Sequence, residues 1–260
     1  MRFFYIYRMK TEALYHLYSQ HYLVDTDTRN IRKNTIFFAL KGENFNGNKF
    51  ANQAIEKGAI FSIVDEEEFV TSAKIILVEN VLKTLQSLAN FHRKRLNIPV
   101  IGLTGSNGKT TTKELIHAVL SKKYKTTSTK GNLNNHIGVP LTLLSMTPST
   151  EIGIVEMGAN HQKEIAFLST ICAPSFGYIT NFGKAHLEGF GGVAGVIKGK
   201  SELYDYIKQH NNTVFVNNLD ALQMEKTKNI NRIIFDENLK LEEVNPFVKL
   251  SYKNTTIQQN

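Results

Sequence analysis

Residues 99–123 constrain the fold of this chain more than any other stretch. The apolar run PVIGLTG at 99–105 predicts a buried strand that ends in a glycine turn. Residues 111–123 then predict a helix, with an apolar face formed by Leu115, Ile116, Val119 and Leu120. A buried strand that leads straight into a helix is the first half of a βαβ unit, so a parallel sheet is expected here.

The same alternation of strands and helices occurs on both sides of this stretch. Strands are predicted at 35–40, 59–65, 74–80, 151–158, 176–182 and 213–218. Helices are predicted at 49–57, 81–96, 161–170 and 192–209. The fold class is therefore α/β: a small N-terminal α/β domain, then a mostly parallel P-loop-type sheet flanked by helices. Because Asn97 and Pro99 end the helix before the central strand, we place the domains at 1–97 and 98–260.

Charge and cysteine usage limit the class of protein. The net charge is +8, but the basic residues are scattered, with short clusters only at 92–95 and 122–125, and no nucleic-acid recognition motif accompanies them. We therefore expect anionic small molecules as partners rather than nucleic acid. Cys172, the only cysteine, lies in an apolar setting that predicts a buried, inert thiol and a reducing compartment.

The N-terminus carries no targeting or membrane signal that we can identify. The apolar run at 3–7 is too short for a signal-peptide core or a membrane span, and Met9 is an alternative start. We therefore expect a cytoplasmic protein without membrane insertion.

The glycine turn carries the residues that phosphate binding requires, although its spacing is unusual. The common phosphate loop, G-x-x-x-x-G-K-[ST], would place its first glycine at Leu103, which is not a glycine. Backbone N–H groups at the start of the helix would still point at one phosphate, Lys109 would add charge, and the Thr110 hydroxyl could ligate Mg²⁺. The alternative is a plain glycine turn with a threonine cap and a surface lysine. We predict a phosphate loop of a different lineage, formed by Gly105, Ser106, Asn107, Gly108, Lys109, Thr110 and Thr111.

Four motifs identify that lineage. TGSNGKTT at 104–111 resembles the ATP loop of the Mur ligases and of their relative folylpolyglutamate synthase. The stretches at 130–144, 156–165 and 181–204 contain GNLNNHIGVP, GANHQKEI and HLEGFG, and they resemble the Mur ligases specifically. The resemblance covers most of residues 25–220. It implies a monomeric, ATP-dependent amide ligase of peptidoglycan precursor synthesis, which joins D-alanyl-D-alanine to UDP-N-acetylmuramoyl-tripeptide through an acyl phosphate.

The resemblance also implies a site for two Mg²⁺ ions. Glu156, at the end of a strand, would hold one ion with Thr110, and His186 matches the ligand of the second. Lys200 matches the lysine that the family carries as a carbamate, which would provide anionic oxygens for the second ion. Each of these three residues could instead be an ordinary surface or structural residue. Lys198 is the neighbour most easily confused with Lys200, but the two lie about 200° apart around a helix, so only one can face the site.

The N-terminal domain resembles the family's uridine-diphosphate-binding domain. DTDTRN at 25–30 matches its entry motif and makes Thr28 and Arg29 candidate substrate contacts, although Arg29 could equally be a surface arginine. In the stretch 39–59, Asn46 and Asn48 replace the usual aspartate and histidine, which keeps hydrogen-bonding capacity but loses charge. In the following domain, the amides at 130–138 could position substrate oxygens: Asn132, Asn134 and Asn135.

The resemblance stops before the family pattern is complete. We find no G-x-x-N-x-x-N segment and no third domain, so the sequence is expected to be a fragment with an incomplete central domain, and its sheet could be left with an unpaired edge. Three hypotheses remain: a ligase that needs its missing portion, a binding unit without turnover, and a folylpolyglutamate-synthase-like ligase or other P-loop phosphotransferase.

Overall fold

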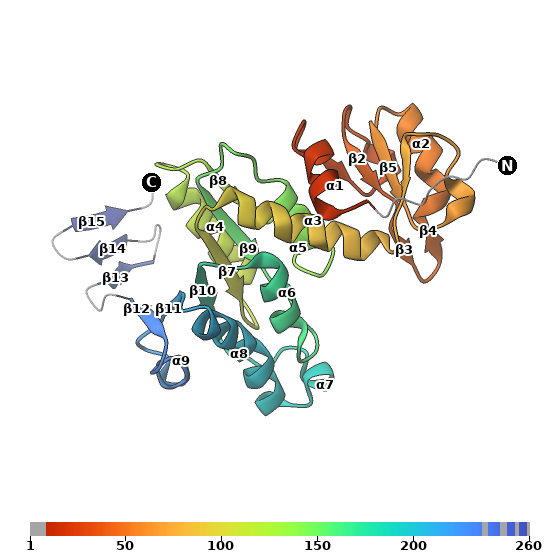
Figure 1. The fold of residues 1–260 in the computed structure, drawn as a ribbon. Coiled ribbons are helices and arrows are strands. Elements are labelled where there is room, and N and C mark those ends of the chain that lie inside the picture. The colour runs from red at the N-terminus through yellow and green to blue at the C-terminus, as the bar shows by residue number, and fades with distance from the viewer. Residues whose placement is uncertain (1–8, 236–238, 245–248, 253–254, 259–260) are drawn as a thin grey trace.

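The computed structural model describes residues 9–235, 239–244, 249–252 and 255–258, and it is built around a six-stranded parallel sheet (Figure 1). The strand order is β12-β11-β10-β7-β9-β8, with all five pairings parallel. The strands are β7 (Val100–Thr104), β8 (Thr126–Ser128), β9 (Ile152–Glu156), β10 (Phe176–Ile179), β11 (Thr213–Val216) and β12 (Asn231–Ile234). β7 is fully buried and lies between β10 and β9, so the loop that follows it opens from the middle of the sheet.

Helices and a second, smaller sheet complete the fold. The helices around the large sheet are α4 (Lys109–Leu120), α5 (Gly138–Leu144), α6 (Glu164–Cys172), α7 (Leu187–Phe190), α8 (Val193–Gln209) and α9 (Ala221–Lys226). The smaller sheet is parallel, in the order β1-β2-β5-β6, with β1 (Val24–Asp25), β2 (Ile36–Phe38), β5 (Phe61–Val64) and β6 (Ile75–Leu77). Two helices, α1 (Thr11–Tyr18) and α2 (Ala51–Glu56), and the short hairpin of β3 (Lys41–Gly42) and β4 (Phe45–Asn46) belong to this part. The predicted α/β class with parallel sheets is confirmed.

The helix α3 (Val81–Leu96) runs from the small sheet to the large one (Figure 1). It begins and ends as predicted, because the Asn80 side chain accepts a hydrogen bond from the Lys83 amide and Asn97 turns left-handed with φ 48°. It packs on α1, α5 and α6. The Tyr18 hydroxyl donates 2.8 Å to the Leu144 carbonyl beside it, so residues from both parts share one buried core. A domain division at 96–98 stays a prediction.

The apolar face predicted for the helix after the loop lies largely at the surface. Leu115 is 63% exposed and Val119 is 71% exposed, whereas the buried side chain of this helix is Lys113. The helix also begins at Lys109 instead of residue 111, since the loop continues into it without a break.

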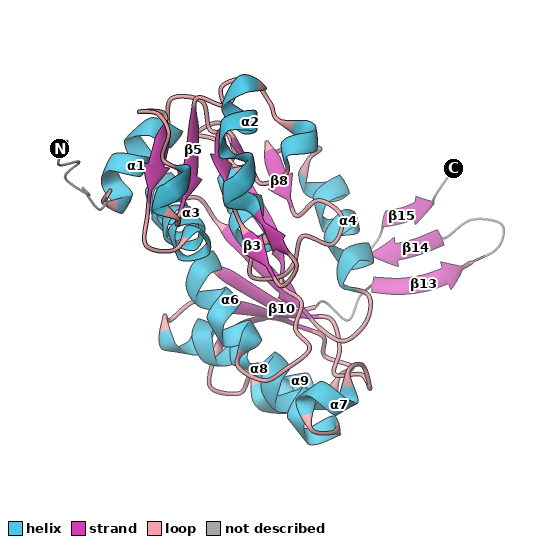
Figure 2. Ribbon diagram, turned by 90° about the vertical axis from the view of Figure 1, so that its right-hand side faces the viewer, coloured by secondary structure: helices cyan, strands magenta, loops and turns pink. Residues whose placement is uncertain are grey.

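Several elements follow from tertiary packing and were not predicted. The helix α6 begins at Glu164 instead of 161, because the Glu164 carboxylate accepts hydrogen bonds from the Asn160 and His161 amides and holds them in a turn. The small helices α1, α5, α7 and α9, the two-residue strand β1 and the edge strands β8 and β12 also appear. An antiparallel sheet of β13 (Leu239–Glu243), β14 (Lys249–Tyr252) and β15 (Thr255–Gln258) lies apart from the main body (Figure 2).

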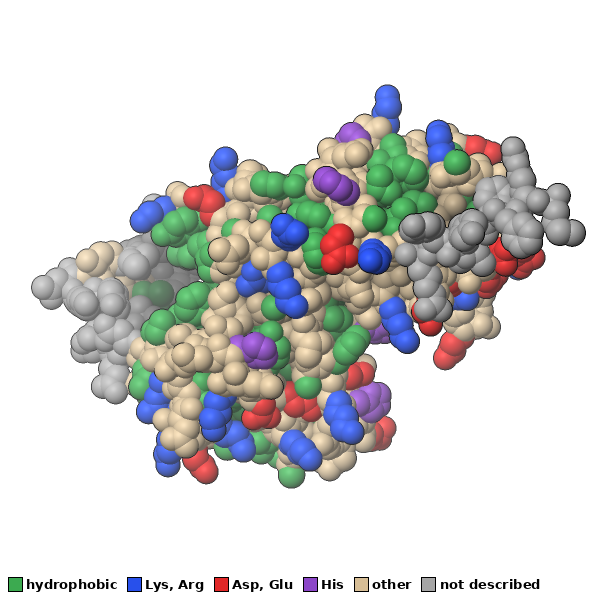
Figure 3. Space-filling model, viewed as in Figure 1, with side chains coloured by type: hydrophobic (Ala, Val, Ile, Leu, Met, Phe, Trp, Pro, Cys, Tyr) green, Lys and Arg blue, Asp and Glu red, His purple; other side chains and the backbone are tan. Residues whose placement is uncertain are grey.

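Two sequence expectations concern burial and charge. Cys172 is completely buried at the end of α6, and burial raises the pKa of its thiol to about 12, as expected of an inert thiol. On the face drawn in Figure 3, lysine and arginine side chains are spread among acidic and apolar ones. Within the described part of the chain, no helix is long and apolar enough to cross a membrane.

Candidate functional site

The loop between β7 and α4 is held tightly against the end of β10. Gly105 has φ +146°, and a Cβ atom there would lie 1.9 Å from the Thr180 hydroxyl, so only glycine fits. The Thr180 hydroxyl donates 2.6 Å to the Asn107 carbonyl, and Asn181 hydrogen-bonds the Ser106 and Asn107 amides. The loop is therefore held in place by the segment that follows β10.

These contacts determine which amides can meet a phosphate. The Ser106 and Asn107 amides are already used by Asn181, at 3.1 and 3.3 Å. The amides in the first turn of an α-helix have no acceptor within the helix. The amides from Gly108 to Thr111 are thus the donors of this loop, and the positive end of the α4 dipole adds to their attraction for an anion.

Lys109 lies over the mouth of the loop. Its ammonium donates to the Gly105 carbonyl at 2.9 Å and to the Ser106 carbonyl at 3.2 Å. Burial lowers the pKa of Lys109, and the Glu156 carboxylate acts in the opposite direction. The charge is thus fixed where a phosphate bound by the loop would lie.

A carboxylate faces the Thr110 hydroxyl from the neighbouring strand. Glu156 ends β9 and is 1% exposed, and its carboxylate lies 3.1 Å from the Thr110 hydroxyl. The Asn134 amide donates 2.8 Å to the other carboxylate oxygen and fixes its orientation. Hydroxyl and carboxylate oxygens are donors that Mg²⁺ accepts. The two side chains therefore have the chemistry of magnesium ligands. Among the described residues, no three His, Cys, Asp or Glu are grouped so that they could hold a metal.

Lys200 is buried on α8, and Lys198 is not. The Lys200 side chain is 1% exposed on α8; its ammonium donates 3.2 Å to the Ala159 carbonyl and lies 5.0 Å from the centre of the Phe190 ring. Burial, followed by the positive charge of Lys109, lowers the pKa of Lys200 to about 8. Lys198 is exposed on another side of the helix. The neutral amine form of Lys200 is therefore a minor form near neutral pH, but it is far more populated than for an ordinary lysine.

A cavity of about 540 Å³ brings several predicted residues together. Lys109, Asn134, Asn135 and His186 line it, and so does Ala159, the carbonyl partner of Lys200. The structure thus gathers the phosphate-loop lysine, the asparagine loop and the candidate metal histidine around one space. His186 adopts a left-handed backbone with φ 56° immediately before α7.

Other predicted residues have a different setting. Asn135 caps α5, accepting hydrogen bonds from the Ile137 and Gly138 amides, and Asn132 is exposed. Thr28 and Arg29 form a short 3-10 turn in the N-terminal part, outside the cavity of Lys109. The Arg29 guanidinium is exposed and pairs with Asp27 at 2.6 Å, and the hydrogen bonds from Arg29 lower the pKa of the Asp27 carboxyl to about 2.

Asn46 and Asn48, which depart from the family motif, are part of the local framework. Asn48 is fully buried, and its amide nitrogen donates to the Asn46 and Asp65 side chains. The Asn46 amide nitrogen in turn donates to both carboxylate oxygens of Glu66. The two amides therefore connect the hairpin region to the end of β5.

Four residues of the site had no role in the sequence prediction. His136, Asn160 and Glu164 line the cavity with Lys109, and Asn181 braces the phosphate loop. All four lie inside the motifs at 130–144, 156–165 and 181–204, so their position within those motifs was the available signal.

Comparison with known proteins decides the family. The family model "Mur ligase middle domain" matches residues 103–258, and "Mur ligase family, catalytic domain" matches residues 21–103. The chain belongs to the Mur ligase family. Two curated relatives are named UDP-N-acetylmuramoyl-tripeptide–D-alanyl-D-alanine ligase. The one from Bacillus subtilis is 41% identical over 202 residues, which cover 77% of this chain and 44% of the relative. The one from Escherichia coli is 41% identical over 187 residues, which cover 72% of this chain and 41% of the relative.

Solved structures of MurF superpose on this chain over most of its length. MurF from Acinetobacter baumannii superposes with a TM-score of 0.76 at 32% identity, covering 90% of this chain and 54% of that one. MurF from Thermotoga maritima, solved in complex with ADP, gives a TM-score of 0.75 at 29% identity, covering 91% and 57%. The chain spans less than half the length of the two curated relatives.

Proposed function

We propose that this Mur ligase chain acts in the ATP-dependent joining of D-alanyl-D-alanine to UDP-N-acetylmuramoyl-tripeptide, a step of peptidoglycan precursor synthesis. The observation that carries the proposal is the cavity that Lys109, Asn134 and His186 line together. Asn134 also orients the Glu156 carboxylate. The curated relatives that match most of this chain bear the name of this ligase. The proposal includes a monomer in the cytoplasm, in keeping with the single buried thiol.

In the proposed reaction, the terminal carboxylate of the tripeptide attacks the γ-phosphate of ATP to give an acyl phosphate and ADP. The amine of D-alanyl-D-alanine then attacks the acyl carbon and releases phosphate. Attack of one anion on another requires positive charge at the transferred group. Lys109 and the first-turn amides of α4 provide it from this chain.

Thr110 and Glu156 would hold one Mg²⁺ ion, with Asn134 fixing the carboxylate. When bound, the ion screens the negative charges of the phosphates. His186 is proposed for a second ion, together with a carbamate on Lys200. The low pKa of Lys200 supports this, because its neutral amine can add to CO₂, losing one proton as the N–C bond forms.

The UDP end of the substrate is proposed to lie in a separate cavity of about 470 Å³, lined by N-terminal residues of 21–32 and central residues of 128–147. Asp27 and Asn30 line it, on either side of Thr28 and Arg29. The 130–136 loop reaches both cavities, with Lys130 and Leu133 in this one and Asn134 in the other. A substrate lying along this loop would bring its peptide end to the phosphate loop.

Calorimetric titration with UDP-N-acetylmuramoyl-tripeptide tests this assignment. We expect saturable binding that Arg29→Ala weakens about tenfold, the effect of one lost charged contact, while Arg95→Ala, which removes an exposed arginine of α3, leaves it unchanged. A folded chain that does not bind the tripeptide, or that binds folates instead, would contradict the proposal. ADP release on adding ATP and D-alanyl-D-alanine then separates a chain that turns over from one that only binds.

A further inference from the structure

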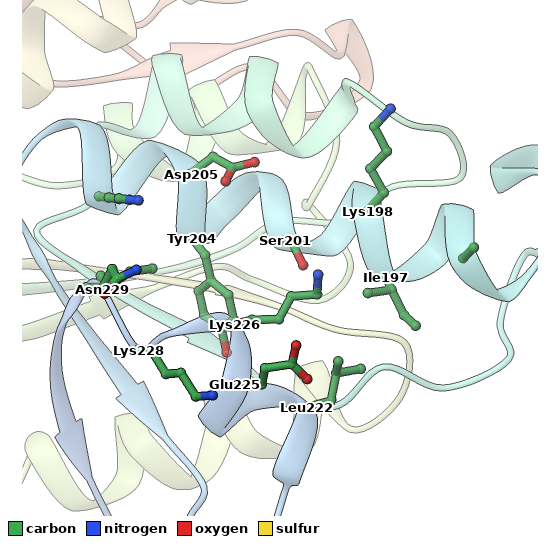
Figure 4. A pocket seen from close by; sticks show the side chains of 13 residues that line it. Ile197, Lys198, Ser201, Tyr204, Asp205, Leu222, Glu225, Lys226, Lys228 and Asn229 are labelled. Atoms are coloured by element: carbon green, nitrogen blue, oxygen red, sulfur yellow. The ribbon is translucent and has the colours of Figure 1, made fainter.

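A second polar cavity, of about 820 Å³, lies between α8 and α9 (Figure 4). It shares no lining residue with the cavity around Lys109. One wall is the side of α8 that carries Ile197, Ser201 and Tyr204, and the other is α9 with the residues that follow it. Nothing in the proposed ligase reaction uses this space.

Two buried hydroxyl groups on α8 belong to this cavity. Ser201 is 9% exposed and Tyr204 is 2% exposed, and neither hydroxyl has a hydrogen-bond partner among the described residues. Residues three apart lie on the same side of a helix, so Ser201 and Tyr204 face the same cavity. Buried polar groups in folded proteins are nearly always hydrogen-bonded, to protein or to ordered water, so both hydroxyls are available to a molecule bound in this cavity. Burial raises the pKa of Tyr204, which keeps its hydroxyl protonated as a donor.

Positive charge faces the hydroxyls from the opposite wall. Figure 4 shows the exposed side chains of Lys226 and Lys228 extending into the space in front of Ser201 and Tyr204. Lys198 also lines the cavity, but its side chain extends in another direction from α8. Two carboxylates, Asp205 and Glu225, also line this space. They stand against four lining lysines, so the lining is net positive: Lys198, Lys208, Lys226 and Lys228. The remaining lining includes the apolar side chains Ile197, Leu222 and Ile230.

We propose that this cavity binds the phosphate group of a small anionic molecule, with Ser201, Tyr204, Lys226 and Lys228 as its donors. A phosphate presents at least three acceptor oxygens and carries up to two negative charges, so it can accept from both walls and offset the net positive charge of the lining. The apolar side chains would contact the rest of the molecule.

Residue-resolved NMR titration of the full chain with inorganic phosphate and pyrophosphate tests this site, because it separates shifts at 197–208 and 222–230 from shifts of the phosphate loop at 105–111. We expect saturable shifts in the first group, and weaker binding of acetate. Tyr204→Phe, which keeps the ring, should weaken phosphate binding about tenfold at this site only. Replacing Lys226 and Lys228 together by glutamine should do the same, whereas the same double change at Lys122 and Lys123 should have no effect.

Three results would overturn the proposal. The first is the absence of saturable shifts at 197–208 and 222–230 while the phosphate loop responds. The second is unchanged phosphate affinity in folded Tyr204→Phe and in the folded double variant at Lys226 and Lys228. The third is acetate binding as tight as phosphate binding, which would assign the site to carboxylates.

Discussion

Replacing Gly105 by alanine tests the geometry of the phosphate loop. Its φ of +146° belongs to a region that only glycine visits easily, so alanine would add about 2 kcal/mol of backbone strain. The new Cβ would also lie 1.9 Å from the Thr180 hydroxyl and 3.0 Å from the Thr180 amide nitrogen. Relieving that overlap breaks the 2.6 Å hydrogen bond from Thr180 to Asn107, which together with the overpacking costs about 2 kcal/mol more. We expect Gly105→Ala to lower the unfolding free energy by about 4 kcal/mol.

Gly108→Ala is the matched control in the same loop. Gly108 has φ +76°, and nothing lies within 4 Å of a Cβ atom built there, so only strain of about 1 kcal/mol is expected. Equilibrium unfolding in urea, followed by circular dichroism, measures both variants against the wild type. Equal losses of stability in the two variants would refute the close contact between the loop and the end of β10.

Three further changes test separate parts of the structure. Burial lowers the pKa of Lys200 to about 8 from the ordinary 10.5, so between these pH values the unfolded chain binds more protons than the folded one. In urea unfolding in CO₂-free buffer, the wild type should therefore gain stability relative to Lys200→Met as the pH rises from 8 to 10.5. A stability difference that does not change with pH would contradict this. Asn134→Ala frees the Glu156 carboxylate and should weaken Mg²⁺-dependent ATP binding about tenfold in calorimetry, whereas Asn132→Ala at an exposed position should not. Tyr18→Phe removes the buried hydrogen bond to Leu144 and should cost about 1 kcal/mol in thermal unfolding; no loss would mean that this contact between the two parts is not formed.

Much of the fold was readable from the sequence because local patterns and tertiary packing agree. The strand at 100–104 is fully buried and therefore continuously apolar, and α3 has a capping asparagine at each end. The apolar residues Leu115 and Val119 show the limit of such reasoning. Their spacing correctly predicts a helix, but spacing cannot show whether other elements pack on that side of the helix. In the structure both side chains are exposed.

The site was predictable where a residue type dictates its chemistry. Lys109, Thr110 and Glu156 were proposed from their positions at strand and helix ends, and the structure brings them together. Asn181 and Glu164 were not proposed, because their roles depend on backbone groups that only the folded chain places near them. The Tyr204 hydroxyl, which has no hydrogen-bond partner among the described residues, could not be foreseen, since an aromatic residue on a helix usually indicates packing alone.

Calorimetric titration of this chain with ATP, with and without Mg²⁺, tests the central claim most directly. Thr110→Val keeps the side-chain shape and removes the hydroxyl that faces Glu156. We predict saturable ATP binding that Mg²⁺ strengthens in the wild type, and that this strengthening is lost in Thr110→Val and in Glu156→Gln. Equal strengthening by Mg²⁺ in all three proteins, or no ATP binding by the folded wild type, would contradict the assignment of this loop as a nucleotide and metal site.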